Sequence, residues 1–462
     1  MPQRPNILAI MVDDMGYGDF GVFSDGSSQT PTLDRLVSES VCLSQHYSAS
    51  CVCAPARAAF LTGRYPHRTG AIDTLEGRGL DRLALKEVTM ADLLKSAGYV
   101  TGLIGKWHLG AFDPRYHPNA RGFDEFVGFR GGWQDYYDWR LDYNGAYHRS
   151  DGRYLTDLFT DEAVQFITRH GREPFFLHLT YNAPHSPFQA PEEDIGPFRE
   201  TGKFTRGVST IYGMLLRMDK GLDRILDVLE REGLEENTIL LFTSDNGPQF
   251  SGQGEMCTVR FNCGYNGAKG SVYEGGIRLP LVLRWPAGLE GGRGYHDLVH
   301  FNDWLPTLLA AAGVEPPTDS ALDGHNVWTI LRGEVDPLDI PRFWQWNRYT
   351  PLVTCNAAMR DGPWKLVRPR IVEAMRVSPE DLAMDRALKY QPELYTDICR
   401  DPEPEREVPL PPPPELYNID RDPLERHDLA QAEPERAARM LRQLETWFES
   451  VEAERRSIDD QA

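Results

Sequence analysis

Carboxylate and amide side chains directly follow two apolar runs of the sequence, and these side chains are Asp13, Asp14, Asp245 and Asn246. In an open α/β sheet, ligands bind beyond the carboxyl ends of the strands. Three carboxylates converging there would repel one another unless a cation lay among them, and all-oxygen ligands suit Ca²⁺ or Mg²⁺. Each pair taken singly is also common in turns, but their joint placement predicts a metal site.

Cationic side chains follow the other two runs, namely Lys106, His108 and His185, and we expect Arg57 and Lys269 to lie with them. Gathered beside a metal ion, they would be tolerable only if a multiply charged anion bound there, and a tetrahedral oxyanion fits. For each histidine alone a hydrogen-bonded structural role is the alternative, and for each lysine a solvated surface position.

Two cysteines stand one residue apart in the stretch SASCVCAPARAAFLTGR, residues 48–64. If a helix begins near Ala54 or Pro55, Cys53 lies at the positive end of the helix dipole and points at the anion. That is where a nucleophile belongs. A thiolate is soft and matches a hard metal poorly, and the residues alone leave this mismatch open.

Apolar runs alternate with helical patterns, which is typical of a parallel sheet wrapped by helices. The runs are residues 6–12, 99–105, 174–181 and 238–244, and the helical patterns are residues 30–40, 89–98 and 209–233. The predicted fold class is therefore α/β, with a large and mostly parallel central sheet flanked by helices.

The pattern changes in the last third of the chain, where residues 361–369 and 415–420 read as short strands. We place a boundary near residue 335, between a catalytic domain (1–335) and a smaller α+β subdomain (336–462) with a short antiparallel sheet. The segment 369–415, rich in proline and charge, is predicted to be an extended surface insertion.

Composition excludes several classes of protein. The chain has 462 residues and a formal net charge of −20, which makes nucleic acid an improbable partner. No apolar run approaches the roughly 20 residues of a membrane span. The first residues lack the features of a signal peptide, so the sequence as written predicts a cytoplasmic protein, or a periplasmic or secreted one if the N-terminus was trimmed.

The seven cysteines do not form a regular framework. Their odd number and irregular spacing argue against a disulfide scaffold, and burial is the expectation for Cys42, Cys355 and Cys399. Cys257 and Cys263 lie in the long segment after SDNG, where they either line the substrate entrance or pack, and packing is the favoured interpretation.

The block CAPARAAFLTGR resembles the CxPxR signature of the formylglycine-dependent sulfatases, members of the alkaline phosphatase superfamily. A second family signature matches GYVTGLIGKWHLG (98–110), and the other active-site blocks occur in the expected order along nearly the whole chain. In that family the cysteine, here Cys53, is oxidised after synthesis to formylglycine. Its hydrate is a hard oxygen nucleophile, which removes the mismatch with the metal.

The resemblance implies an alkaline phosphatase-like fold and a role for each site residue. Ca²⁺, or Mg²⁺, would be bound by Asp13, Asp14, Asp245, Asn246 and an oxygen of modified Cys53. Arg57 would hold the modified side chain, and the sulfate oxygens would be held by Lys106, His108, His185 and Lys269.

The implied reaction has two steps. One hydroxyl of the hydrate, activated by the metal and Asp245, attacks sulfur while His185 or Lys269 protonates the departing alcohol. His108 then removes the proton of the second hydroxyl, and sulfate leaves. A formylglycine-generating enzyme is the implied transient partner. The family usually has a small residue at the position of Cys51 and a serine at the position of Ala56. Both departures affect how efficiently Cys53 would be converted to formylglycine.

Two aromatic stretches, residues 128–139 and 343–349, suit a sugar ring stacked on one face and hydrogen-bonded at its edge. In the first stretch, Trp133 and Asp135 are candidates for substrate binding. We predict a carbohydrate sulfate as the substrate, and the predicted activity also covers aryl sulfates. The alternatives are a phosphodiesterase or phosphonate monoester hydrolase of the same superfamily and, less favoured, a non-catalytic protein that binds sulfated ligands.

Overall fold

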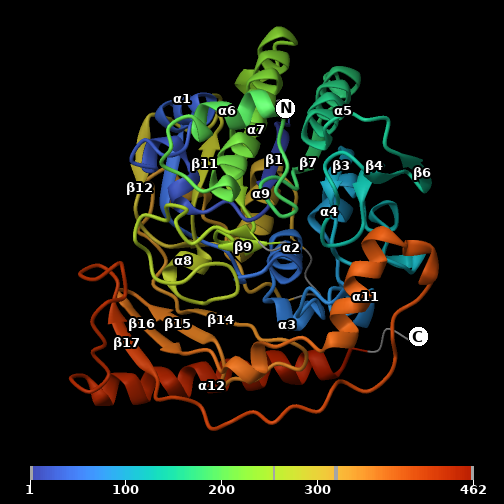
Figure 1. Cartoon of the computed structure of the whole chain (residues 1–462). Helices are drawn as coiled ribbons and strands as arrows, with labels where there is room; N and C mark the ends of the chain where they lie inside the picture. The colour runs from blue at the N-terminus through green and yellow to red at the C-terminus, as the bar shows by residue number, and fades with distance from the viewer. Residues whose placement is uncertain (1–3, 253–254, 317–320, 459–462) are drawn as a thin grey trace.

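A mixed sheet of eleven strands runs through the part of the chain that this computed structural model describes, residues 4–252, 255–316 and 321–458 (Figure 1). Its strands are β1 (Asn6–Val12), β2 (Val41–Tyr47), β3 (Val100–Lys106), β4 (Glu125–Phe129), β5 (Arg140–Tyr143), β6 (Ala146–Arg149), β7 (Phe175–Thr180), β8 (Thr238–Ser244), β11 (Arg278–Arg284), β12 (Arg293–Tyr295) and β13 (Val299–His300). Their order is β12-β2-β11-β8-β1-β7-β3-β4-β5-β6, with β13 also paired to β2.

The centre of the sheet is parallel. Strands β8, β1, β7, β3 and β4 run in one direction, whereas β11, β5 and β6 are antiparallel to their neighbours. The four apolar runs predicted from the sequence are β1, β3, β7 and β8, with ends within one residue of those expected. Their carboxyl ends therefore meet at one edge of the sheet, as predicted.

Helices cover both faces of the sheet. In β1, Ile7 and Met11 belong to one apolar core and Leu8 and Val12 to the other, so the strand is buried on both sides. The first core is completed by α2 (Cys53–Thr62), α4 (Met90–Ser96), α9 (Trp304–Ala312) and α10 (Trp328–Leu331). The second is completed by α1 (Pro31–Glu39), α5 (Leu155–His170), α6 (Glu192–Arg199) and α7 (Arg206–Arg231). Within the described residues no helix is long and apolar enough to cross a membrane.

A smaller antiparallel sheet lies beneath the main one, at the bottom of Figure 1. It contains β14 (Arg342–Gln345), β15 (Ala357–Asp361), β16 (Trp364–Arg368) and β17 (Glu415–Asn418), in that order. The long helix α12 (Pro434–Arg456) packs on it through Met440, Leu444 and Trp447. The fold also contains the short helices α3 (Pro66–Thr69) and α8 (Glu274–Ile277) and the paired short strands β9 (Ser251–Gly252) and β10 (Glu255–Met256).

The segment 369–415 is not wholly extended, which corrects the expectation from its proline content. It contains α11 (Pro379–Tyr390), which begins where the Ser378 hydroxyl accepts a hydrogen bond from the backbone N–H of Asp381. The Asp381 carboxylate in turn accepts hydrogen bonds from Arg78 Nε (2.7 Å) and the Tyr349 hydroxyl (2.6 Å). The contact with Arg78 holds α11 against the catalytic domain, and the contact with Tyr349 holds it within the smaller subdomain.

The end of α12 is tied to the catalytic domain by Glu454, whose carboxylate forms ion pairs with Arg64 and Arg68. Although partial burial alone would raise it, these two arginines lower the pKa of Glu454 to about 2. A folded-state pKa below the unfolded value of about 4.3 means that the carboxylate stabilises the fold above that pH. This contribution is lost as the pH falls toward 2.

We therefore expect Glu454→Gln to lower the free energy of unfolding by about 1 kcal/mol at neutral pH, a value reduced for partial solvent exposure. Urea titrations of both proteins should show the difference shrinking between pH 4.5 and pH 3. Glu449→Gln, at an exposed position of the same helix, is the matched control. A difference that does not change with pH would contradict this account of the ion pairs.

Candidate active site

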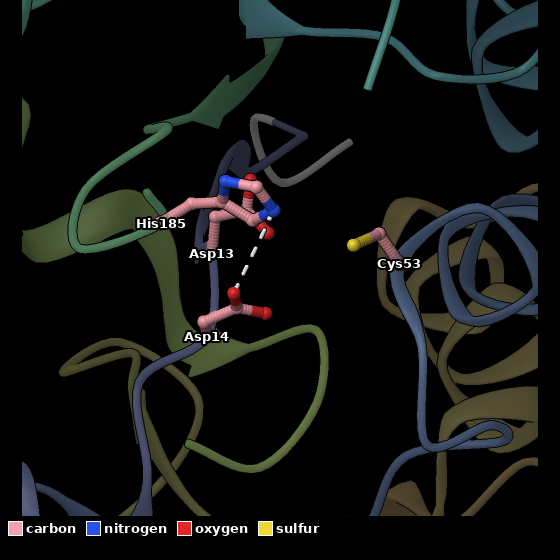
Figure 2. A group of neighbouring side chains, drawn as sticks. All are labelled: Asp13, Asp14, Cys53 and His185. Carbon is pink, nitrogen blue, oxygen red and sulfur yellow. Dashed lines mark ion pairs between the residues drawn. The ribbon is translucent and has the colours of Figure 1, made fainter. Parts of the chain in front are cut away.

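The carboxyl edge of the sheet gathers four possible metal ligands: Asp13, Asp14, Cys53 and His185 (Figure 2). One ligand atom from each lies within 4.8 Å of the others. The two aspartates follow β1, and Asp14 adopts a left-handed backbone conformation (φ 67°) that turns the chain away from the strand. Both aspartates and Cys53 are buried, whereas His185 reaches the group from the loop after β7 and is partly exposed.

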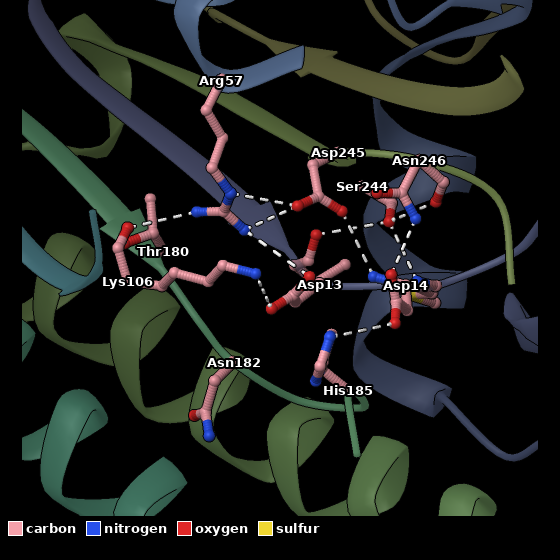
Figure 3. Close-up of polar contacts among 12 residues, drawn as sticks. Asp13, Asp14, Arg57, Lys106, Thr180, Asn182, His185, Ser244, Asp245 and Asn246 are labelled. Atoms are coloured by element: carbon pink, nitrogen blue, oxygen red, sulfur yellow. Dashed lines mark hydrogen bonds and ion pairs between the residues drawn. The ribbon is translucent and has the colours of Figure 1, made fainter. Parts of the chain in front are cut away.

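Asp245 and Asn246, which follow β8, complete the oxygen-rich side of the site (Figure 3). Asp245 Oδ1 accepts the backbone N–H of Asp14 at 3.2 Å, and Asn246 Nδ2 donates to Asp14 Oδ1 at 2.7 Å. The structure therefore brings together the four oxygen-bearing residues that the sequence singled out.

Three cations are interleaved with these carboxylates. Arg57 donates to Asp245 Oδ2 from Nε at 3.0 Å and from Nη2 at 2.8 Å. Lys106 Nζ donates to Asp13 Oδ2, and Lys269 Nζ donates to Asp14 Oδ2, both at 2.7 Å. With three carboxylates against three cations, a divalent ion would leave the site positively charged and suited to an anion.

Lys106 is positioned by close packing of two strands. The preceding residue, Gly105, has a φ of 114°, and a Cβ there would lie 1.9 Å from the carbonyl oxygen of Thr180. Only glycine allows β3 and β7 to approach in this way. The carbonyl of Lys106 then accepts hydrogen bonds from Arg57 Nη1 at 3.1 Å and Thr180 Oγ1 at 2.8 Å, which fixes the strand end.

Two buried oxygen atoms support the metal assignment. Asp13 Oδ1 and Asn246 Oδ1 have no hydrogen-bond partner among the described residues, although both side chains are fully buried. A buried polar atom without a partner is costly and needs an explanation. A hard cation between these oxygens would satisfy both, so the residues present fit a divalent metal ion. Burial and the nearby Asp13 charge raise the pKa of Asp245 to about 6, as expected for crowded carboxylates.

Burial and neighbouring cations lower the pKa values of both histidines of the site. Burial, reinforced by Lys106 and Arg57, lowers the pKa of His108 well below its ordinary value. Its Nδ1 has no partner in the described structure, and its Nε2 lies 3.4 Å from the carbonyl oxygen of Thr74. Burial and Lys269 likewise lower the pKa of His185 to about 3, and its Nε2 lies 3.7 Å from Asp14 Oδ2.

Cys53 is the first residue of α2 rather than the residue before it, a difference of one position from the prediction. No side chain caps this helix end, so its first N–H groups remain available to an anion. Burial raises the pKa of the Cys53 thiol to about 12, so the unmodified residue is a protonated thiol. Cys51 packs elsewhere, in an apolar cluster with Trp344, and accepts a weak hydrogen bond from Asn356 Nδ2 at 3.7 Å.

A cavity of about 1500 Å³ opens onto Cys53. Its lining includes the site residues His108, His185 and Lys269, and the aromatic side chains Phe250, Tyr265, Trp133, Trp346 and Tyr390. Trp133, one of the two predicted substrate-binding residues, therefore lines the cavity. A second cavity of about 650 Å³ also has Trp133 in its lining.

Asp135 does not line either cavity, in contrast to the prediction that it binds substrate. Its Oδ1 accepts the backbone N–H groups of Tyr137 and Asp138, both at 2.8 Å, and its Oδ2 accepts Gln189 Nε2 at 2.9 Å. An aspartate that organises a turn is common in loops of this composition. Asp135 therefore shapes the loop that carries Trp133.

The remaining cysteines lie outside the site. Cys257 is buried in an apolar core, and partly buried Cys263 donates to the carbonyl oxygen of Phe23 at 3.4 Å, so packing rather than the substrate entrance explains both. Cys42 and Cys355 are buried as predicted. Cys399 is only partly buried, which corrects the expectation, because it lies in the surface segment beyond α11.

Sequence reasoning missed several cavity residues, and these are Thr74, Asn266, Arg348, Arg370, Asp385, Arg386, Glu425 and Arg426. They come from loops and from α11. Arg348 lies in the aromatic stretch 343–349, and Arg370, Asp385 and Arg386 lie in the charge-rich segment 369–415, but neither signal singles out an individual residue.

Comparison with known proteins identifies the family. Residues 5–314 match the family model "Sulfatase", and residues 266–372 match "N-sulphoglucosamine sulphohydrolase, C-terminal". The chain belongs to the sulfatase family. Human N-acetylgalactosamine-6-sulfatase is 36% identical to this sulfatase over 376 residues, covering 74% of this chain and 68% of the relative. Mouse arylsulfatase J is 30% identical over 466 residues, covering 96% of this chain and 75% of the relative.

The fold is also that of solved sulfatases. The crystal structure of Ps i-CgsB in complex with k-i-k-neocarrahexaose is 30% identical, with a TM-score of 0.79, and covers 96% of this chain and 93% of its own. Sulfatases generally use a metal ion and a modified cysteine, and this sulfatase has a buried group of acidic, cysteine and histidine side chains at the edge of its sheet.

Proposed function

We propose that this sulfatase hydrolyses sulfate monoesters of carbohydrates to alcohol and inorganic sulfate. The observation that carries the proposal is the position of Cys53, at the uncapped start of α2 and within 4.8 Å of ligand atoms of Asp13, Asp14 and His185. We further propose that a formylglycine-generating enzyme oxidises Cys53 to formylglycine before the protein becomes active.

Asp13, Asp14, Asp245 and Asn246 would hold Ca²⁺, with Mg²⁺ as the alternative hard ion. The metal would act as a Lewis acid on sulfate and would favour ionisation of the nucleophilic hydroxyl. Formylglycine, as its hydrate, would provide one hydroxyl for attack on sulfur and a second for release of sulfate.

The side chains of this chain supply binding and proton transfer. Arg57, Lys106 and Lys269 surround the anion site with positive charge. As the S–O bond to the alcohol breaks, the departing oxygen takes a proton. Lys269 donates it, or His185 does so once the negative charge of the bound sulfate ester has raised the pKa of His185 enough for the ring to be protonated. His108, neutral and with a free Nδ1 among the described residues, accepts the proton of the second hydroxyl.

The two histidines are expected to respond differently to leaving-group acidity. His185→Ala should slow substrates with poor leaving groups by about 10²-fold and activated aryl sulfates much less, because only the former need protonation. His108→Ala should slow all leaving groups alike and accumulate a sulfated Cys53 position. Steady-state rates across a series of phenyl sulfates, with intact-mass analysis of each variant, would measure both effects. Equal losses at every leaving group in both variants would refute the division of roles.

Three features support a carbohydrate substrate. The cavity of about 1500 Å³ exceeds the roughly 300–1000 Å³ typical of small-molecule pockets. The partly buried Trp133 and the exposed Tyr390 offer rings on which a sugar can stack. The similar proteins include an N-acetylgalactosamine-6-sulfatase and the structure of Ps i-CgsB in complex with k-i-k-neocarrahexaose. A panel of sulfated sugars, aryl sulfates and steroid sulfates tests this, and turnover of steroid sulfates alone would contradict it.

The family favours sulfate ester hydrolysis over the phosphodiesterase or phosphonate monoester hydrolase alternative, since both relatives described above are named sulfatases. They also argue against a protein that only binds sulfated ligands. The direct test compares kcat/KM for an aryl sulfate and for an aryl phosphodiester, in a preparation whose Cys53 is converted. A preference for the phosphodiester would overturn the proposal.

A further inference from the structure

Three arginines with exposed side chains line the cavity that holds Cys53, and these are Arg370, Arg386 and Arg426. We call them the arginine rim. Among the described residues, no hydrogen bond or ion pair is formed by their guanidinium groups. Many other arginines of the chain do form such pairs, including Arg348 of the same cavity, whose Nη1 lies 2.8 Å from Asp73 Oδ1.

Two carboxylates line the cavity, and they offset only part of the charge of the rim. Glu425 Oε1 lies 2.9 Å from Lys365 Nζ, and its Oε2 accepts the backbone N–H of Glu274 at 2.7 Å. Asp385 accepts Trp133 Nε1 at 3.5 Å and interacts with the charge of Arg386. One carboxylate therefore stands against three arginines, and the rim keeps a net positive charge.

This local charge contrasts with the chain as a whole, which carries a formal net charge of −20. A strongly negative protein repels a polyanion unless the binding cleft has the opposite potential. The planar guanidinium group of arginine binds sulfate and carboxylate through bidentate hydrogen bonds, and it is less strongly hydrated than the ammonium group of lysine. The rim is thus suited to anions beyond the one held beside Cys53.

The rim residues come from separate segments that tertiary contacts hold in place. Arg386 lies on α11, which Arg78 and Tyr349 fix through Asp381. The guanidinium of Arg426 approaches Gly264, with Nη2 3.6 Å from the position that a Cβ would take there. Trp133 lines both cavities, and the first, of about 1500 Å³, has room for a ligand longer than one sugar.

We propose that the arginine rim is a second anion-binding subsite, which selects oligosaccharides carrying a further anionic group, sulfate or carboxylate, next to the sugar whose sulfate is removed. This inference rests on the proposed sulfatase activity and names the substrate class of that same site. It predicts a polyanionic oligosaccharide rather than an isolated monosulfated sugar.

The test compares three disaccharides that share one scissile sulfate: the first has no other charge, the second has a sulfate on the neighbouring sugar, and the third has a carboxylate there. The dianion preference is the kcat/KM of a disaccharide with two anionic groups divided by the kcat/KM of the disaccharide with only the scissile sulfate. Each single substitution of a rim arginine by alanine should lower this ratio by about fivefold. The triple variant should lower it by about 100-fold if the three effects add. Arg439→Ala, at an exposed position of α12 outside both cavities, should leave the ratio unchanged.

The dependence on salt and on the type of anion gives two further tests. Raising NaCl to 0.5 M should reduce the dianion preference of the wild type but not of the triple variant. The triple variant can lose the preference for the sulfated disaccharide alone or for the carboxylated disaccharide alone. The disaccharide that loses its advantage over the uncharged one then identifies the anion that the rim binds. An unchanged ratio in the triple variant overturns the subsite.

If no sulfate ester is turned over at all, the proposed activity fails, and the subsite is judged by binding instead. The Kd of the disulfated disaccharide, measured by calorimetry on Cys53→Ala with and without the three rim substitutions, should rise at least tenfold on removing the rim. An equal Kd in both proteins would overturn the subsite.

Discussion

Cys53→Ala is expected to fold normally and to lose turnover by about 10⁴-fold or more. The hard, oxygen-rich surroundings of this position require an oxygen nucleophile, and burial keeps the unmodified thiol protonated, with a pKa raised to about 12. Methyl in place of the modified side chain removes the attacking atom while leaving the buried start of α2 intact. Circular dichroism and kcat/KM for an aryl sulfate would measure fold and activity.

The matched control is Cys51→Ser, two residues away in a buried cluster beside Asn356 and Trp344. A serine hydroxyl can keep the contact with Asn356, so activity should stay within about twofold of the wild type. Mass spectrometry of the peptide spanning residues 48–57 should show sulfur replaced by oxygen at Cys53 and not at Cys51, in a fraction that follows specific activity. An active preparation with Cys53 wholly as free thiol would end this mechanism.

Asp13→Asn should lower kcat/KM by about 10³-fold and abolish the stabilisation of the protein by Ca²⁺. The substitution keeps the shape of the side chain but removes one negative charge from a buried site that already holds Arg57 and Lys106. Without that charge, a divalent ion would face net repulsion. Because a ligand that binds only the folded state raises Tm, the wild type should show a Ca²⁺-dependent Tm and the variant should not.

Asp336→Ala, at an exposed position outside the site, is the control for the metal experiment and should behave as the wild type. Exhaustive chelation should inactivate the wild type, and added Ca²⁺ should restore it. Full activity after chelation, together with a Tm that does not change with Ca²⁺ or Mg²⁺, would contradict the metal assignment.

The core of the catalytic domain was predictable because its strands are buried on both faces and read as continuous apolar runs. Residues 6–12 and 238–244 became β1 and β8 with the ends expected. The antiparallel strands β5 and β6 were not foreseen, since β6 is exposed along its whole length and carries no apolar run.

The sequence by itself determined which residues could do chemistry. Side chains that follow parallel strands meet at one edge of the sheet, so the order of apolar runs and polar residues is enough to place Asp13 and Asp245 at the same edge. Cys53 and Arg57 lie in one local motif, which the amino-acid order alone displays.

Only the tertiary structure decided what surrounds that centre. Asp135 was predicted to bind substrate but organises a turn, because its partners, including Gln189, are set by loop packing. The helix α11 forms within a proline-rich segment because Asp381 accepts hydrogen bonds from Arg78 and Tyr349. These two residues lie about 300 and about 30 positions away in the sequence. The arginine rim likewise depends on contacts between distant segments, which no local pattern of residues encodes.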